Sequence, residues 1–99
     1  MASFIIKRDG RRETFNKQKV MNAVKKAFLA VDGTLTKAGV KKIRRIGDEI
    51  NKRVIKSTYP LSVEEIQDMV EELLMDTDRK DVARAYIVYR NERSKIRSR

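Results

Sequence analysis

The sequence predicts an α+β, mainly α fold in which an N-terminal β-hairpin lies as a lid over a four-helix bundle. Two short runs of β-prone residues flank Asp9-Gly10, and this arrangement is typical of a hairpin. Four later segments repeat apolar residues with helical spacing. With 99 residues, no repeat and no low-complexity linker, the chain is expected to form a single domain over residues 1–99.

The hairpin is expected over residues 4–15, with strands at about 4–8 and 11–15. Asp9-Gly10 is the turn signal, because glycine tolerates the positive φ that a type I′ turn requires. A two-stranded hairpin is only marginally stable alone, so it must pack across the helices. Side chains alternate between the two faces of a strand. One face should therefore carry Ile5, Lys7, Glu13 and Phe15.

The first two helices are expected at about 17–31 and 36–56. Asn16 is a good N-cap for the first helix, and Gly33 ends it. Thr36 opens the second helix. Their inward-facing residues are predicted to be Val20, Ala23, Val24, Ala27, Phe28 and Val31, then Val40, Ile43, Ile46 or Ile50, and Val54.

The last two helices are expected at about 63–75 and 79–95, after the one proline of the chain. Ser62 and Glu65 form a capping box, in which the serine oxygen accepts from an amide and the glutamate reaches back. Asp78 is expected to cap the last helix. The predicted inward-facing residues are Ile66, Met69, Val70, Leu73 and Leu74, then Val82, Ala85, Tyr86 and Tyr89.

Composition excludes several classes of protein. The chain has neither cysteine nor histidine, so it contains no thiolate or imidazole metal site, no cysteine nucleophile and no Ser-His-Asp triad. No stretch approaches 18 uncharged apolar residues, and the N-terminus lacks the apolar core of a signal peptide. These features fit a cytoplasmic protein that does not enter membranes, although a chain without cysteine carries no redox label.

The formal net charge of +10 is unevenly distributed. Residues 7–26 and 37–56 each hold eight basic and two acidic side chains, whereas residues 60–81 hold eight acidic and two basic ones. Such blocks can place one sign of charge in a cleft and attract an anionic partner. They can equally be solvated helix surfaces, so charge alone does not distinguish a nucleic acid from a nucleotide.

The predicted hairpin face combines an apolar floor, a cation and a carboxylate at Ile5, Lys7, Glu13 and Phe15. This combination suits a purine nucleotide, but from pattern alone a charged edge hairpin that resists aggregation explains it at least as well. No glycine-rich phosphate loop is present. The acidic block over residues 60–81 fits a solvated helix face better than a cation site. Nothing in the sequence resembles a positioned base and nucleophile, so catalysis is not expected.

Three segments in order resemble the ATP-cone domain. They are Ile5-Ile6-Lys7-Arg8-Asp9-Gly10-Arg11-Arg12-Glu13-Thr14-Phe15-Asn16, Val63-Glu64-Glu65-Ile66-Gln67-Asp68-Met69-Val70-Glu71 and Val82-Ala83-Arg84-Ala85-Tyr86-Ile87-Val88-Tyr89-Arg90. The resemblance spans about residues 4–93. It implies a non-catalytic regulatory module that binds ATP or dATP, with Mg²⁺ accompanying the nucleotide. Such modules lie at the N-terminus of ribonucleotide reductases and behind a zinc ribbon in repressors of reductase genes.

The resemblance also implies roles for particular residues. Phosphate ligands are expected at three basic positions, Lys7, Arg8 and Lys19. The adenine-side hydrogen-bonding pair is expected at Glu13 and Asn16. Apolar walls of the base pocket are expected at Ile5, Phe15, Val20 and Ile66, with Val63 and Gln67 beside them. Tyr89 and Arg90 match a Tyr-Arg pair of the family and complete the residues expected to bind the nucleotide.

The implied partners are a ribonucleotide reductase subunit or further copies of the chain. Without cysteine the chain cannot carry the zinc ribbon, and 99 residues cannot hold a reductase barrel, so a free-standing or excised domain is expected. The alternative function is a nucleic-acid-binding regulator that uses the basic helical blocks. Against it, aromatic residues make up 6% of the chain and follow the core pattern, which leaves no stacking platform.

Overall fold

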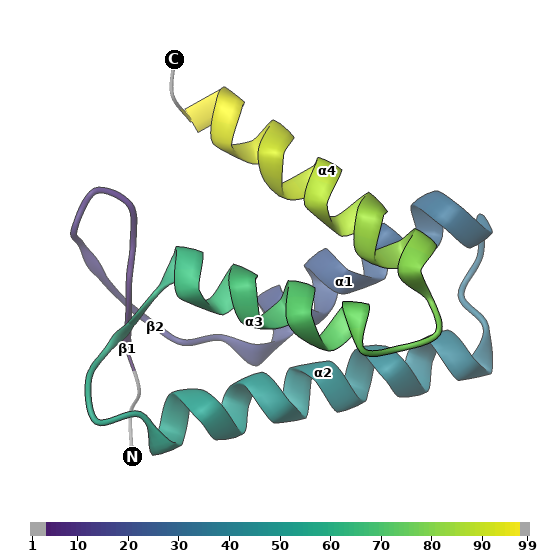
Figure 1. Ribbon diagram of the computed structural model, residues 1–99. Helices are drawn as coiled ribbons and strands as arrows, with labels where there is room; N and C mark the ends of the chain where they lie inside the picture. Colours follow the sequence, from purple (N-terminus) through teal and green to yellow (C-terminus); the bar gives the residue numbers. More distant parts are fainter. Residues whose placement is uncertain (1–3, 98–99) are drawn as a thin grey trace.

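The computed structural model describes the backbone of residues 4–97 and the side chains of residues 4–92 (Figure 1). The elements, in chain order, are β1 Phe4–Ile6, β2 Arg12–Thr14, α1 Lys17–Asp32, α2 Lys37–Lys56, β3 Leu61–Ser62, α3 Val63–Met75 and α4 Lys80–Arg97. Four helices with a small N-terminal sheet confirm the predicted fold class. Residues 1–3 and 98–99, which the predicted domain includes, lie outside the described residues.

The hairpin forms, but its turn is not the predicted type I′ turn. That turn needs positive φ at both central residues, whereas among the described residues only Gly10 and Gly33 have positive φ. The Gly10 amide donates to the Lys7 carbonyl at 2.9 Å, and the Lys7 amide donates to the Arg11 carbonyl at 2.8 Å. Gly10, at φ +85°, is therefore the last residue of a four-residue turn that begins at Lys7, and Arg11 rejoins the ladder. This longer turn shortens the strands to three residues each.

A third strand that the sequence pattern did not predict completes the sheet, whose order is β2-β1-β3. β3 pairs in parallel with β1, with Ile5 opposite Leu61 and Ile6 opposite Ser62. Two residues are too few to show a periodicity, which is why only a boundary was visible there. Because β3 runs directly into α3, the sheet ties the hairpin to the start of that helix.

The predicted helix caps form at three of four sites. The Asn16 side chain accepts from Gln18, and the Thr36 hydroxyl accepts from Gly39. Ser62 makes the full capping box of α3. The expected cap at Asp78 is wrong. There the Thr77 hydroxyl accepts the Arg79 amide at 3.1 Å and α4 begins one residue later, at Lys80.

The core lies where the four helices meet. Side chains that are fully buried come from every helix and include Val24, Phe28, Ile50, Leu74 and Val82. Two residues expected inside are instead exposed, Val31 at 39% and Val40 at 40%. Each lies in an end turn of its helix, where fewer elements cover the apolar stripe. Ala83, outside the predicted stripe of α4, is fully buried.

Candidate functional site

A cavity of about 360 Å³ opens between the hairpin, α1, α3 and α4. Pockets of this size hold small organic ligands. Twelve of the thirteen residues predicted from the sequence line it: Ile5, Lys7, Arg8, Glu13, Phe15, Asn16, Lys19, Val20, Val63, Ile66, Gln67 and Tyr89. The structure thus brings together residues that are up to 84 positions apart in the chain.

Each wall of the cavity follows from a local periodicity. In the hairpin, Ile5 is paired with Glu13, and strand alternation turns both side chains toward the cavity. Phe4 does not line the cavity, and the Arg12 guanidinium lies 5.6 Å from the centre of the Phe4 ring. The beginning of α1 contributes Asn16, Lys19 and Val20. Spacings of three and four residues place such side chains on one face of a helix. The same spacing in α3 presents Val63, Ile66 and Gln67.

Two cavity residues that are predicted to bind the nucleotide are ion-paired with each other. Lys19 Nζ lies 2.9 Å from Glu13 Oε1, with the lysine side chain 66% exposed. This hydrogen bond, with further attraction from Lys7 and Arg11, holds the pKa of the Glu13 carboxyl below its usual value. Glu13 is therefore firmly ionised near neutral pH and offsets part of the positive charge of the cavity.

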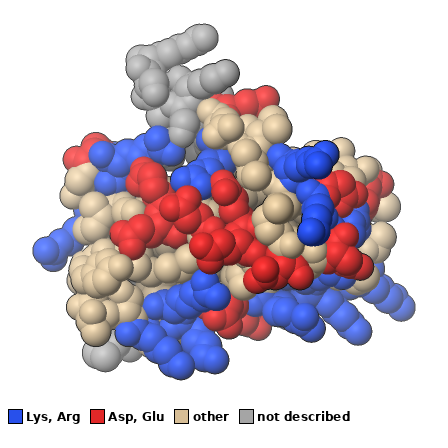
Figure 2. All heavy atoms as spheres, in the orientation of Figure 1, with Lys and Arg blue, Asp and Glu red and all other residues tan. Residues whose placement is uncertain are grey.

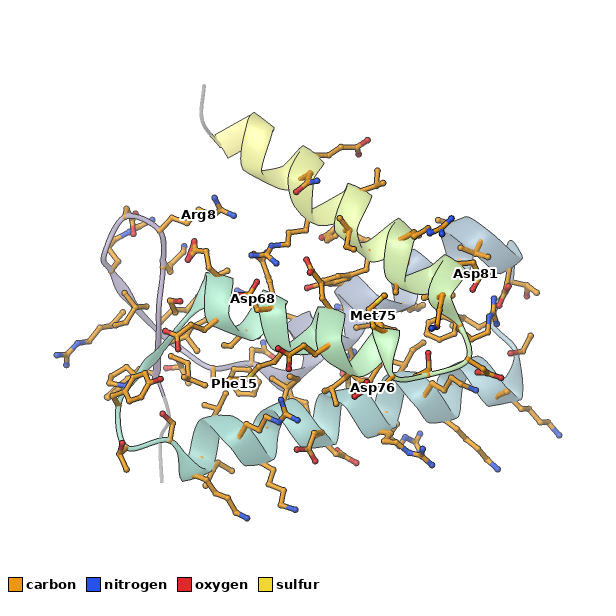
Figure 3. All side chains as sticks on the ribbon, viewed as in Figure 1. Arg8, Phe15, Asp68, Met75, Asp76 and Asp81 are labelled. Atoms are coloured by element: carbon orange, nitrogen blue, oxygen red, sulfur yellow. The ribbon has the colours of Figure 1, made fainter. Side chains whose placement is uncertain are left out.

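A second ion pair links the hairpin turn to α3. Arg8 Nε lies 3.3 Å from Glu64 Oε1, and each side chain is about one-third exposed. Arg8 extends from the turn on the side of the molecule that faces α3 and α4 (Figure 3). The pair therefore holds the turn beside the first turn of α3.

The cavity wall also contains unused hydrogen-bonding capacity. Gln67 Oε1 is buried and has no partner among the described residues. Buried acceptors without a partner are uncommon in proteins, so such an atom marks a place where a donor can bind. The Asn16 oxygen is occupied by the cap of α1, which leaves its amide group free to donate.

Six residues that were not predicted as ligands also line the cavity: Thr14, Asn22, Ala23, Lys26, Val70 and Tyr86. Lys26 is a further cation, and its Nζ lies 5.6 Å from the centre of the Tyr89 ring. Lys26 follows Asn22 by four residues and Lys19 by seven, and this helical spacing places all three on one face of α1, which could have identified Lys26 from the sequence. Burial raises the pKa of the Tyr86 hydroxyl.

Arg90 is the one predicted ligand that does not line the cavity. Its Nη1 donates to Asp68 Oδ1 at 2.8 Å and to Glu71 Oε1 at 2.7 Å. Although partial burial opposes it, these hydrogen bonds raise the pKa of the Arg90 guanidinium. The structure therefore shows Arg90 as a link between α4 and α3.

In the described part of the chain, no group of three or more His, Cys, Asp or Glu side chains is placed to hold a metal ion. Within the same residues, no helix has the length and apolarity needed to cross a bilayer. The cavity is lined by apolar side chains, by cations and by hydrogen-bonding groups without a partner among the described residues.

A hairpin packed over four helices, with cations and apolar side chains lining one cavity, defines the class of small α+β domain to which the chain belongs. The chain belongs to the ATP-cone family, because residues 3–95 match the family described as ATP cone domain. This match confirms the resemblance seen in the sequence. The ATP cone is a regulatory domain and not a catalytic one.

Relatives of two kinds share this domain. The chain is 41% identical to the vitamin B12-dependent ribonucleoside-diphosphate reductase of Thermoplasma acidophilum, over 98% of this chain and 13% of the enzyme. It is 36% identical to the anaerobic ribonucleoside-triphosphate reductase of Haemophilus influenzae, over 100% of this chain and 14% of the enzyme. It is also 32% identical to the transcriptional repressor NrdR of Kosmotoga olearia, over 91% of this chain and 54% of the repressor. The chain thus spans a small part of the reductases and about half of the repressor.

Proposed function

We propose that this chain is a non-catalytic regulatory domain that binds ATP or dATP in the cavity beneath the hairpin. The composition of that cavity is the observation that carries the proposal. Lys7 and Arg8 from the hairpin and Lys19 and Lys26 from α1 supply positive charge, and apolar side chains from the hairpin, α1 and α3 line the same cavity. A nucleotide has the matching division into an anionic triphosphate and a flat base.

The base is proposed to lie against Ile5, Phe15 and Ile66. Adenine presents an acceptor, N1, beside an amine donor. The free Asn16 amide can donate to N1, and the unpartnered Gln67 Oε1 can accept from the amine. Guanine presents the opposite pattern at this edge, so the same two groups disfavour it.

The phosphates are proposed to bind Lys7, Arg8 and Lys19. Two of these cations already contact carboxylates, Glu13 and Glu64, which a phosphate oxygen would replace. Glu13, once released by Lys19, becomes a second acceptor for the adenine amine. A Mg²⁺ ion would be held chiefly by the phosphates themselves, because Glu13 is the only acidic residue among the described residues that line the cavity.

Regulation is proposed to follow from the way the cavity is built. The hairpin, α1, α3 and α4 all contribute walls, so a nucleotide that contacts all of them favours one relative arrangement. This rearrangement would change the surface through which the domain contacts a ribonucleotide reductase subunit or another copy of the chain, and so would alter the assembly of that complex. Couplings of this kind are typically about 1–3 kcal/mol. We propose that the chain acts in the cytoplasm, where ATP and dATP are available.

Titration calorimetry with ATP, dATP and GTP tests the proposal. We expect saturable binding of both adenine nucleotides and weaker binding of GTP. Lys7→Ala and Lys19→Ala should each weaken ATP binding about 10-fold, because each removes a charge-assisted contact of roughly 1.5 kcal/mol. Lys25→Ala is the matched control, since Lys25 is an exposed lysine of α1 that does not line the cavity.

Two results would overturn this function. One is the absence of saturable ATP binding at millimolar concentration. The other is equal weakening by Lys25→Ala and Lys19→Ala, which would indicate attraction by net charge alone. Size-exclusion chromatography with and without ATP then tests the coupling to assembly separately from binding.

A further inference from the structure

The exposed face of α2 carries a row of cations that the nucleotide cavity does not use. Figure 2 shows Lys and Arg side chains along the lower edge of the molecule, where α2 runs, beneath a band of Asp and Glu. We define the α2 basic stripe as six exposed residues: Lys37, Lys41, Arg44, Arg45, Lys52 and Lys56.

These six cations have no acidic partner in the described part of the chain, where no carboxylate lies within 4.0 Å of them. The other two basic residues of α2, Lys42 and Arg53, do have acidic partners in Asp78 and Glu49. The helix therefore divides into a paired side and an unpaired side. The unpaired side holds a concentrated positive charge.

The geometry of the stripe is that of a straight, extended surface. At about 100° per residue, its six positions fall within roughly one-third of the helix circumference. At about 1.5 Å per residue, Lys37 and Lys56 are separated by roughly 28 Å along the axis. Asp48, which lies in the same sector, is held by Lys17 Nζ at 2.9 Å and so offsets little of the charge.

We propose that the α2 basic stripe binds the phosphate backbone of a nucleic-acid duplex without reading its sequence. A duplex presents a regular line of negative charge, which matches a row of cations about 28 Å long. α2 has no aromatic residue on which an unpaired base could stack, so a duplex fits better than a single strand. The stripe consists of Lys and Arg alone, and contacts from these side chains to phosphate oxygens carry no sequence information.

A second copy of the chain is a poorer partner for the stripe. Its acidic band, over α3, is the only large source of negative charge seen on the face in Figure 2. Within that band Asp68 and Glu71 are paired with Arg90, and Glu64 is paired with Arg8. Three of the five acidic side chains of α3 therefore already contact a cation of their own chain, and the stripe of a second copy would have to compete with these contacts.

The test is fluorescence anisotropy of a labelled 20-base-pair DNA duplex of arbitrary sequence, titrated with the 99-residue chain at several salt concentrations. Each phosphate contact releases counterions, so affinity falls linearly with log salt by about 0.9 per contact. Six contacts predict a slope near −5. The triple variant Arg44→Gln, Arg45→Gln, Lys52→Gln should flatten this slope by roughly 2.7.

The matched control removes the same charge elsewhere, with Lys25→Gln, Lys80→Gln and Arg84→Gln. All three residues are exposed, lie outside α2, and have no carboxylate within 4.0 Å in the described residues. The control should keep the steep slope. Circular dichroism checks that both triple variants remain folded.

Three outcomes would overturn the inference. Equal flattening by both triple variants would mean that net charge, and not α2, attracts the duplex. Displacement of the duplex by poly-glutamate at equal charge concentration would indicate an acidic protein as the partner. Loss of duplex binding in Lys19→Ala would place the phosphates in the nucleotide cavity. Conversely, duplex binding that survives in Lys19→Ala supports the stripe even if ATP does not bind at all.

Discussion

Lys19 Nζ lies 2.9 Å from Glu13 Oε1, so the first turn of α1 is joined to β2 across the wall of the cavity. Both residues are predicted to contact a nucleotide, one through its phosphates and the other through its base. A phosphate oxygen at this place must compete with the Glu13 carboxylate for Lys19. The ionisation state of Glu13 therefore affects how readily Lys19 can bind a phosphate.

The first prediction concerns the pKa of Glu13. Lys19→Gln removes the hydrogen bond that is the largest cause of the lowered pKa, so the Glu13 pKa should rise toward its usual value. In the unchanged chain the folded-state pKa lies below the unfolded one. The stabilisation from Glu13 is thus present above the unfolded pKa and is lost as pH falls through the folded pKa. NMR titration of the Glu13 side-chain carboxyl measures the shift.

Lys25→Gln is the control for this titration, because Lys25 lies on the same helix but has no contact with Glu13. It should leave the Glu13 pKa in place. An unchanged Glu13 pKa in Lys19→Gln would show that the ion pair does not persist in solution.

The second prediction concerns the pair between Arg8 and Glu64. Glu64→Gln removes the carboxylate that pairs with Arg8, so no ion pair has to be broken when a phosphate binds Arg8. Exposed ion pairs are worth up to about 1 kcal/mol, which corresponds to ATP binding that is tighter by up to roughly five-fold. Calorimetric titration of the variant with ATP measures the change.

Glu72→Gln supplies the comparison, since it removes the same charge from an exposed position of α3. Glu72 has no Lys or Arg nitrogen within 4.0 Å in the part of the chain that the structure describes. A general effect of charge would improve ATP binding in both variants alike. Weaker binding in Glu64→Gln would instead assign Glu64 a direct role in the site.

The helices could be predicted from the sequence because burial imposes a periodicity on it. Phe28 and Leu74 follow the spacing that places them inside, and both are fully buried. β3 could not be predicted, since two residues carry no period and their pairing with β1 depends on tertiary contacts. The expected cap at Asp78 was wrong because two neighbouring polar residues can each accept a backbone amide, and the sequence does not show which one does. Thr77, one residue earlier, has the geometry to accept the Arg79 amide.

The site could be predicted only in part. Strand alternation placed Ile5, Lys7, Glu13 and Phe15 on one face, and family resemblance supplied the residues of α1 and α3. Ion pairs between elements leave no such pattern, because they depend on side-chain conformations. Arg79 illustrates this. It donates to both oxygens of Asp32, 47 residues away, and these hydrogen bonds raise its pKa further.

The third prediction concerns Arg90, which the family resemblance matched to a nucleotide-binding residue and which links α4 to α3 in the structure. Arg90→Met leaves Asp68 and Glu71 without their shared donor. Hydrogen bonds to charged groups contribute about 1.5–3 kcal/mol, and partial exposure reduces this, so the free energy of unfolding should fall by roughly 1–2 kcal/mol. Urea denaturation measures this loss.

Calorimetry on the same variant separates a structural role from a ligand role. If Arg90 acts by joining the two helices, ATP affinity should fall less in Arg90→Met than in Lys19→Ala. Arg84→Met, an exposed arginine of α4 with no carboxylate within 4.0 Å among the described residues, should change neither quantity. An unfolding free energy that stays constant while ATP binding falls as far as in Lys19→Ala would assign Arg90 a direct contact with the nucleotide. It would then have to leave both carboxylates when the nucleotide binds, and the salt bridge seen here would be one of two alternative positions of its side chain.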